Sequence, residues 1–369
     1  MTLPLRPELA GLEPYGAPQL TVEARLNVNE NPYAPPPSVV DAITAAVHTA
    51  AGRLNRYPDR DFTALRGDLV RYLAAESHVD FLEIRNIWVA NGSNEVMLHL
   101  HQAFGGPGHK VLSFAPTYSM YPEYARDTIT DFVTLPRRED FTIDLDAATA
   151  AIAELQPSMV IVASPNNPTG TALTLDEVRA LADAAMAVPG GCVLVIDEAY
   201  AEFRRKGVPS AASILPEYPN LAISRTMSKA FALAGGRVGY LAAHEPVIDA
   251  LRVVRLPYHL SAVTQATARA ALAHHRVLQA QVDEIRAERD DTVGWLRGQG
   301  YTVADTDANF ALFGPFEDRE RVFQGLLARG VLIRVTGPEG WLRVSIGTPE
   351  EMALFRSALL EVVSEEATR

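Results

Sequence analysis

Short apolar runs alternate along the chain with longer segments of helical spacing, and this alternation constrains the fold more than any other feature. Five runs rich in valine, isoleucine and leucine have the length and composition of buried strands. They cover residues 87–90, 110–114, 159–163, 192–196 and 221–224. Strand, helix and strand in repetition predict an α/β fold with a mostly parallel central sheet sandwiched by helices.

A polar motif follows each of these five runs closely. The motifs read NGSNE (91–95), APTY (115–118), NNPTG (166–170), DEAY (197–200) and RTMSK (225–229). Open α/β sheets bind their ligands at the C-terminal ends of the strands, where loops and helix N-termini converge. The five motifs therefore predict one ligand site at that edge of the sheet.

The pattern changes after about Pro257. An alanine-rich, charged stretch at 264–297 predicts a helix, and alternating segments at 301–303, 309–313 and 342–346 predict strands, which together indicate a smaller α+β domain. Many prolines among the first forty residues predict an extended arm before a helix that begins near Ser38. We divide the chain into an arm over 1–40 that packs on the small domain, a large domain over 41–258 and a small C-terminal domain over 259–369.

Charge and cysteine content argue against several classes of protein. With 45 acidic against 33 basic residues, a net charge of -12 and no cluster of basic residues, nucleic acid is not an expected partner. The N-terminus lacks the apolar region of a signal peptide and no apolar stretch approaches membrane-spanning length, so we expect no membrane association. The single cysteine, Cys192, lies at an apolar run and is expected to be a buried, inert thiol, from which we infer a reducing cytoplasm.

Lys229 is the candidate for covalent catalysis. Catalysis through an imine needs an amine that loses its proton readily, and a cation such as Arg237, eight residues on, disfavours the ammonium form. Taken alone, Lys229 would more often be a surface lysine on a helix. Joined to the hydroxyls of Thr226 and Ser228 and to the upstream motifs, it outlines a pyridoxal phosphate site.

Four further residues have functions that such a cofactor needs. Asp197 could keep the pyridine nitrogen protonated, although it could also cap a helix. Tyr200 and Asn167 could hydrogen-bond the phenolic oxygen and lower the proton affinity of the imine. Tyr118 could stack on the ring, although an aromatic residue at this position could also fill the core.

The cofactor phosphate needs several donors. Gly92, Ser93 and Asn94 open a predicted helix at Glu95, whose N-terminus would offer backbone N–H groups and a positive dipole end. An Asn-Gly pair alone would more often mark only a turn. Side chains that could complete the phosphate site are Thr226, Ser228 and Arg237.

Two arginines in the predicted small domain are candidates for substrate binding. Arg334 and Arg343 each interrupt an apolar run and could bind a dianionic or carboxylate group. Arginines at strand edges are also common salt-bridge partners, so both readings stay open. We expect no metal site.

These motifs, with LNVNENPY (26–33), NRYPD (55–59), RLPYHLS (255–261) and LRVSIGT (342–348), resemble the histidinol-phosphate aminotransferases, which are fold-type I pyridoxal-phosphate-dependent transferases. The resemblance covers nearly the whole chain. It implies that Lys229 is the Schiff-base lysine and that the roles given above for the other cofactor residues hold. It also implies a homodimer in which Tyr57 reaches the cofactor phosphate of the neighbouring subunit. Substrate-pocket residues implied by the resemblance are Tyr15, Asn29, Tyr258, Arg334 and Arg343.

The resemblance implies transfer of the amino group of L-histidinol phosphate to 2-oxoglutarate. The products would be imidazole acetol phosphate and L-glutamate, in L-histidine biosynthesis. An aromatic amino acid aminotransferase remains an alternative, because it would share every cofactor motif. A threonine-phosphate decarboxylase is a further alternative with a similar pattern, whereas a ligand-sensing DNA-binding regulator conflicts with the acidic charge.

Overall fold

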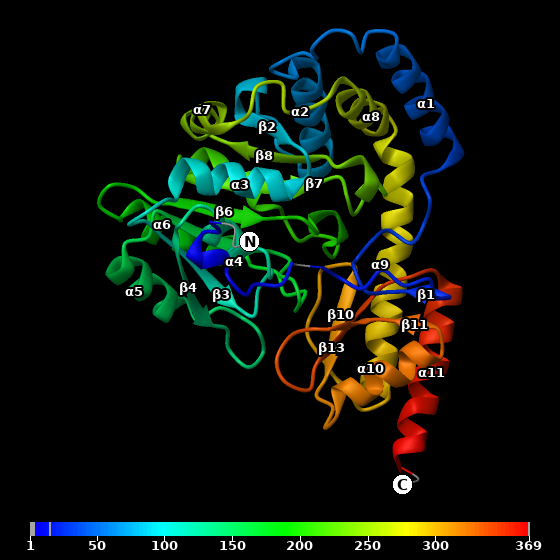
Figure 1. Cartoon of the computed structure of the whole chain (residues 1–369). Helices are drawn as coiled ribbons and strands as arrows, with labels where there is room; N and C mark the ends of the chain where they lie inside the picture. Colours follow the sequence, from blue (N-terminus) through cyan, green and yellow to red (C-terminus); the bar gives the residue numbers. More distant parts are fainter. Residues whose placement is uncertain (1–3, 15, 368–369) are drawn as a thin grey trace.

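The computed structural model describes residues 4–14 and 16–367 and contains a seven-stranded central sheet flanked by helices (Figure 1). The strand order is β2-β8-β7-β6-β5-β3-β4, and every strand except β8 runs in the same direction. The strands are β2 (Ile87–Ala90), β3 (Lys110–Ala115), β4 (Asp131–Pro136), β5 (Met159–Ala163), β6 (Val193–Asp197), β7 (Leu221–Thr226) and β8 (Gly239–Ala243). The predicted mostly parallel sheet is confirmed.

The five strands expected from apolar runs are all present, but β4 and β8 were not predicted because they lack such a run. Residues 87–90 and 159–163 coincide with β2 and β5, and the other three differ by one or two residues at their ends. β4 lies at the sheet edge and is exposed or half-exposed along its length, so it lacks an apolar run. β8 has the sequence GYLAA, whose small residues give little strand signal although every residue is buried.

Helices connect and cover the strands. In the part of the chain that the structure describes they are α1 (Pro37–Ala51), α2 (Thr63–Ser77), α3 (Ser93–Phe104), α4 (Tyr121–Asp127), α5 (Leu145–Leu155), α6 (Leu175–Met186), α7 (Glu245–Val254), α8 (Ala262–Ala273), α9 (His275–Gly298), α10 (Arg319–Ala328) and α11 (Pro349–Ala367). None of these helices is long and apolar enough to cross a membrane. α6 begins at a capping box, in which Thr174 Oγ1 accepts from the N–H of Glu177 and the Glu177 carboxylate accepts from the N–H of Thr174.

The single helix predicted over 264–297 is wrong, because the chain forms two helices there. α8 ends and α9 begins on either side of His274, whose backbone leaves the helical region at φ -110 and ψ 17. The stretch has no glycine or proline near the break, so composition gives no warning of it. α9 then runs from the large sheet to the C-terminal part of the molecule (Figure 1).

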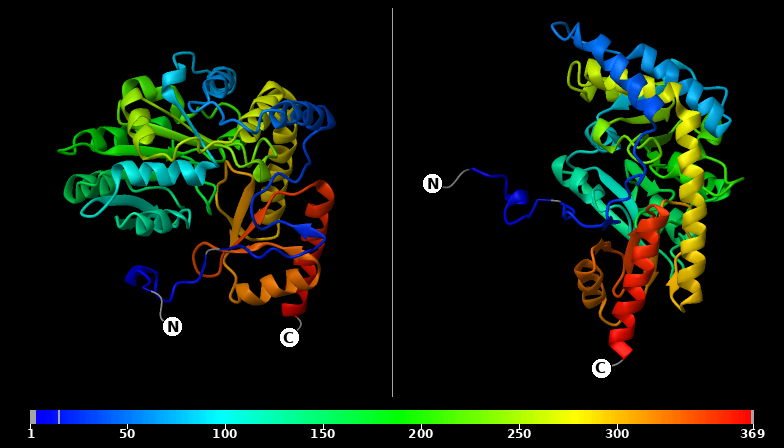
Figure 2. Two further views of the ribbon diagram at one scale, coloured as in Figure 1. Left: turned by 45° about the horizontal axis from the view of Figure 1, so that its top comes forward. Right: turned by 90° about the vertical axis from the view of Figure 1, so that its right-hand side faces the viewer.

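A second, four-stranded antiparallel sheet lies in the C-terminal part, in the order β12-β13-β10-β9. Its strands are β9 (Thr302–Val303), β10 (Phe310–Gly314), β12 (Arg334–Val335) and β13 (Leu342–Ser345). Near this sheet, β1 (Ala24–Arg25) pairs in parallel with β11 (Val331–Leu332), so a segment close to the N-terminus is tied to the C-terminal region. Residues 4–14 extend away from the rest of the molecule, as the right-hand view of Figure 2 shows.

Cys192 lies just before β6 and is buried, as predicted. Burial raises the pKa of its thiol to about 12. The thiolate is therefore a negligible fraction near neutral pH, which fits an inert residue.

Candidate functional site

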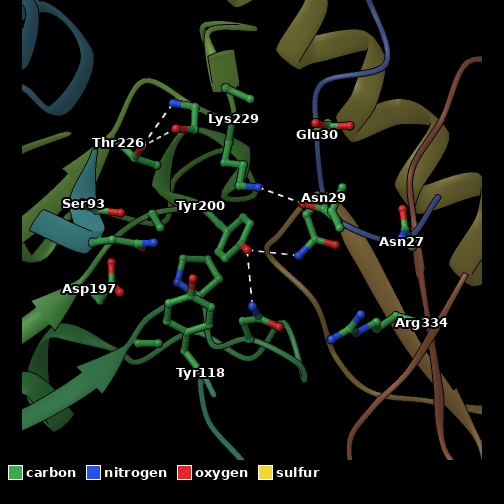
Figure 3. Close-up of a pocket in the computed structure, with 18 of the residues that line it drawn as sticks. Asn27, Asn29, Glu30, Ser93, Tyr118, Asp197, Tyr200, Thr226, Lys229 and Arg334 are labelled. Atoms are coloured by element: carbon green, nitrogen blue, oxygen red, sulfur yellow. Dashed lines mark hydrogen bonds between the residues drawn. The ribbon is translucent and has the colours of Figure 1, made fainter. Parts of the chain in front are cut away.

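A cavity of about 460 Å³ opens where the strands of the central sheet end. It is bounded by loops of this sheet, by residues of the N-terminal arm and by β12 and β13 (Figure 3). Most of the predicted site residues line it: Asn29, Ser93, Asn94, Tyr118, Asn167, Asp197, Tyr200, Thr226, Ser228, Lys229, Arg237, Arg334 and Arg343.

The reversed strand β8 explains how Arg237 reaches this edge. β8 is antiparallel to both β2 and β7, so its first residue, Gly239, lies opposite Ala90 and Thr226 at the ends of those strands. A Cβ at Gly239 would lie 2.2 Å from the backbone nitrogen of Ser93, so only glycine fits under the loop that opens α3. Arg237, two residues before β8, is thereby placed beside that loop.

One end of the cavity is suited to a phosphate group. It is formed by residues 92–94 and by the Arg237 side chain. Gly92 has φ +85, and a Cβ there would lie 2.5 Å from Nη2 of Arg237. The Arg237 guanidinium donates to Ser228 Oγ at 3.3 Å, and Ser228 Oγ also accepts from Thr226 Oγ1 at 3.0 Å. A helix N-terminus, two hydroxyls and a guanidinium therefore converge on one small volume, which suits an anion.

Asp197, the last residue of β6, is buried, and only one of its two carboxylate oxygens has a hydrogen-bond partner among the described residues. Its Oδ2 accepts a hydrogen bond from Tyr121 Oη at 2.8 Å, whereas Oδ1 is buried with no hydrogen-bond partner among the described residues. Burial raises the pKa of this carboxyl to about 6, against the lowering effect of the Tyr121 hydrogen bond. A buried carboxylate oxygen without a partner is costly, so this position suits a ligand that brings a proton donor.

Lys229 faces the same cavity from the opposite side (Figure 3). Its ammonium donates to the backbone carbonyl of Val28 at 2.9 Å. Burial, together with the neighbouring charges of Arg343 and Arg237, lowers the pKa of Lys229 to about 8, and Glu30 opposes this shift. A substantial fraction of the amine is therefore unprotonated at a slightly alkaline pH, as a nucleophile requires.

Four more predicted residues line the centre of the cavity. Tyr200 Oη accepts from Asn29 Nδ2 at 3.0 Å and from Asn167 Nδ2 at 3.5 Å. The Tyr118 ring packs edge-on against Tyr121, with ring centroids 5.6 Å apart, and also contacts the core. Tyr118 thus has both features that the sequence left open, because it lines the cavity and packs on apolar residues.

The two candidate arginines have different surroundings. Arg343 is buried and donates to Asn167 Oδ1 and to the backbone carbonyl of Asn27. Arg334, its register partner on β12, is half-buried, and its side chain makes no hydrogen bond or ion pair with any residue that the structure describes. Arg334 therefore presents a charged group to the cavity without a protein counter-ion.

Some predicted residues do not meet at this cavity within one chain. Tyr57 is 80% exposed and stacks on Tyr258, with ring centroids 4.4 Å apart, and neither ring lines the cavity. Gly92 lies beside the cavity and acts through its backbone. Tyr15 falls outside the described residues.

The structure also adds residues that the motifs did not single out. Tyr121 supports Asp197, and Asn27 and Val28 offer backbone carbonyls to Arg343 and Lys229. Asn27 and Val28 belong to the recognised LNVNENPY motif, so the motif itself was the available signal. Tyr121 gave no such signal, because its hydrogen bond to Asp197 joins two residues that are far apart in the sequence and meet only in the folded chain.

Comparison with known proteins defines the class of this site. Residues 23–359 match the family model of class I and II aminotransferases. The chain belongs to this family, and its architecture is the fold-type I architecture expected from the sequence.

Within that family the chain belongs to the histidinol-phosphate aminotransferases. It is 60% identical to the histidinol-phosphate aminotransferase of Thermobifida fusca over 97% of this chain and 95% of the relative. It is 58% identical to histidinol-phosphate aminotransferase 3 of Burkholderia lata, over 99% and 97% of the two chains. The crystal structure of the Sinorhizobium meliloti histidinol-phosphate aminotransferase in complex with pyridoxal-5'-phosphate superposes with a TM-score of 0.84 at 26% identity, and covers 98% of each chain.

Because the Asp197 carboxyl is buried, we expect its ionisation to destabilise the cofactor-free protein, to an extent that depends on pH. The pKa of Asp197 is about 6 in the folded protein, against an ordinary value of 3.8. As the pH rises from 3.8 to about 6, the unfolded chain therefore loses this proton before the folded protein does. The free energy of unfolding falls over this pH range. Asp197→Asn removes the charge and should stabilise the cofactor-free protein by about 2 to 3 kcal/mol more at pH 8 than at pH 4. Urea denaturation at the two pH values measures this difference.

The exposed Asp80 offers a matched control for that substitution. Asp80→Asn makes the same chemical change at an exposed position, and its effect on the free energy of unfolding at each pH is subtracted from that of Asp197→Asn. An Asp197→Asn protein whose gain does not depend on pH would contradict the assigned burial cost.

Proposed function

We propose that this chain transfers the amino group of L-histidinol phosphate to 2-oxoglutarate, with pyridoxal 5'-phosphate as cofactor. The products are imidazole acetol phosphate and L-glutamate, and the step belongs to L-histidine biosynthesis. One observation carries the proposal: the Lys229 amine, the half-satisfied Asp197 carboxyl and the uncompensated Arg334 guanidinium face a single cavity. The names of the relatives in Thermobifida fusca and Burkholderia lata support the choice of substrate.

The donor set of the cavity fits the cofactor. The partnerless Oδ1 of Asp197 suits the protonated pyridine nitrogen, and the loop at Gly92 with Arg237 suits the phosphate. Tyr200 and Asn167 are placed for the phenolic oxygen, and Tyr118 for the ring face. When bound, the cofactor supplies an electron sink for the bond that breaks at the substrate α-carbon.

Lys229 is proposed to be the covalent anchor and the proton carrier. Its amine would hold the cofactor through a covalent link. Once freed by the substrate amine, the Lys229 amine would accept and return the proton of the substrate α-carbon. Its lowered pKa, about 8, favours this exchange near neutral pH.

The arginine pair is proposed to select anionic substrates. Arg334 has no protein counter-ion among the described residues, so an anionic group of the substrate would give its charge a partner. Arg343 lies one strand away on β13 and is held by Asn167 and Asn27. Two guanidinium groups suit the phosphate of L-histidinol phosphate and, in the second half-reaction, the carboxylates of 2-oxoglutarate.

Single-turnover kinetics test the substrate. Holoenzyme is mixed with L-histidinol phosphate or L-phenylalanine without 2-oxoglutarate, and the change in visible cofactor absorbance is followed. We expect the phosphorylated donor to react at least about 100-fold faster, because two charge-assisted contacts are gained. Arg334→Gln should remove most of this preference, because the substrate phosphate then loses one of its two guanidinium partners. Equal wild-type rates for the two donors would favour an aromatic amino acid aminotransferase.

We further propose that the chain acts as a homodimer whose subunits share their sites. Exposed apolar side chains lie close in sequence to the two stacked tyrosines, Tyr57 and Tyr258, namely Leu54, Val253 in the last turn of α7, and Leu256. An apolar group of this kind marks a protein interface. Tyr57 would then donate its hydroxyl to the cofactor phosphate bound by the other subunit.

Mixed dimers test this sharing. Lys229→Ala and Tyr57→Phe chains are unfolded, mixed and refolded, and activity is measured at limiting cofactor. If Tyr57 serves the opposite subunit, each mixed dimer contains one intact site and binds cofactor roughly tenfold more tightly than the Tyr57→Phe homodimer.

The control places both substitutions on one chain and mixes it with the wild-type chain. A mixed dimer of that kind has no intact site if Tyr57 acts across the interface. Recovery of full cofactor affinity in this control dimer, and not in the first, would show that Tyr57 serves its own subunit.

The division into an arm over 1–40, a large domain over 41–258 and a small domain over 259–369 also stays a proposal. The pairing of β1 with β11 and the run of α9 between the two sheets support it. We also propose a cytoplasmic location, because the proposed reaction is a biosynthetic step.

A further inference from the structure

Ser345, the last residue of β13, holds one residue of the N-terminal arm at two points. Its hydroxyl accepts from the backbone N–H of Asn29 at 2.9 Å and donates to Asn29 Oδ1 at 2.8 Å. Both residues are buried, at 3% and 2% exposure. One hydroxyl can do both because it is a donor and an acceptor.

The contact with Ser345 fixes which way the Asn29 amide points. Because Oδ1 is engaged by the serine, the amide nitrogen of Asn29 faces Tyr200 and donates to its hydroxyl at 3.0 Å. Asn29 has φ 56, and its own carbonyl accepts from Asn309 Nδ2 at 3.1 Å. The residue is therefore locked in a left-handed conformation by three separate hydrogen-bonding groups, and its side chain has little freedom to turn.

The orientation of the Asn29 amide sets the orientation of the Tyr200 hydroxyl. Tyr200 Oη accepts from both Asn29 and Asn167, so its own hydrogen cannot point at either amide. Figure 3 shows the Tyr200 hydroxyl facing the Asn29 amide, with Lys229 and Asp197 around it. In the holoenzyme the hydroxyl hydrogen is then directed to a further acceptor, and the phenolic oxygen of the cofactor is the acceptor that the proposed function provides.

The same strand carries a substrate-binding candidate. Arg343 lies two residues before Ser345 on β13, so both side chains are on the same face of the strand. Arg343 donates to the carbonyl of Asn27, and Ser345 engages Asn29, which places two contacts on one short arm segment. A shift of β13 would therefore be transmitted to Tyr200 through Asn29.

We propose that Ser345 is a positioning residue for the reaction: it holds the Asn29 amide so that Tyr200 donates to the phenolic oxygen of the cofactor and keeps the Lys229–cofactor linkage deprotonated near neutral pH. This inference rests on the proposed function. Ser345 does not touch the cofactor in this account and acts only through Asn29.

A pH titration of the visible absorbance of the holoenzyme tests the proposal. Ser345→Ala loosens the Asn29 amide and weakens donation by Tyr200, so the midpoint of the titration should move upward by roughly half to one pH unit. kcat should fall at neutral pH, and KM for the phosphorylated donor should change little because both arginines remain.

Ser113→Ala is the matched control. Ser113 is a buried serine on β3, outside the cavity, whose hydroxyl donates to the carbonyl of Ile161 at 2.8 Å. Its removal costs a comparable hydrogen bond and should lower stability without moving the titration midpoint. A purely structural role for Ser345 would make the two variants behave alike, which would overturn the proposal.

Asn29→Gly tests the route of the effect. Glycine tolerates a positive φ, so this variant removes the amide without adding backbone strain. In the Asn29→Gly background, Ser345→Ala should produce no further shift of the midpoint, because its effect passes through the missing amide.

The outcomes separate this inference from the proposed function. An additive shift in the double variant, or an unchanged midpoint in Ser345→Ala, would overturn the positioning role while leaving the cofactor assignment intact. A wild-type protein that shows no visible cofactor band with added pyridoxal 5'-phosphate would overturn both.

Discussion

The site depends on the direction of the strands in the central sheet. Because six strands run the same way, their C-terminal ends bring the loops at Asn94, Tyr118, Asn167, Tyr200 and Lys229 to one edge. β8 runs the other way, and for that reason its beginning, with Arg237, reaches the same edge. Strand direction therefore decides that residues more than a hundred positions apart share one cavity.

A cluster of buried charged side chains lies next to the ends of β6 and β7, where these strands reach the site. Arg225 on β7 is 1% exposed and contacts Glu198 at 2.8 Å and Glu76 of α2 at 2.7 Å. Glu198 directly follows Asp197, and Arg225 directly precedes Thr226. Loss of one partner would leave a buried charge uncompensated, so the cluster fixes how the ends of β6 and β7 sit against α2. The positions of Asp197 and Thr226 thus depend on residues outside the cavity.

Much of this arrangement could be predicted from the sequence, because buried strands leave apolar runs and each run is followed by its polar motif. β4 and β8 could not be predicted in this way. β4 is an exposed edge strand and β8 is rich in glycine and alanine, so neither has an apolar run. The break at His274 lies in a stretch of helical composition that has no glycine or proline near the break. The contacts of Val28 and Ser345 depend on the path of the arm across the C-terminal sheet, which no local pattern encodes. The role that we propose for Tyr57 requires a second chain.

The central claim is that the cavity holds pyridoxal 5'-phosphate through Lys229. The sequence contains three lysines, at positions 110, 206 and 229, so covalent labelling can decide among few sites. Holoenzyme is reduced with borohydride, which makes a lysine–cofactor link permanent, and the digested protein is mapped by mass spectrometry. The account predicts one cofactor label per chain, on the peptide that contains Lys229. A label on Lys110 or Lys206, or no label on Lys229, would contradict it.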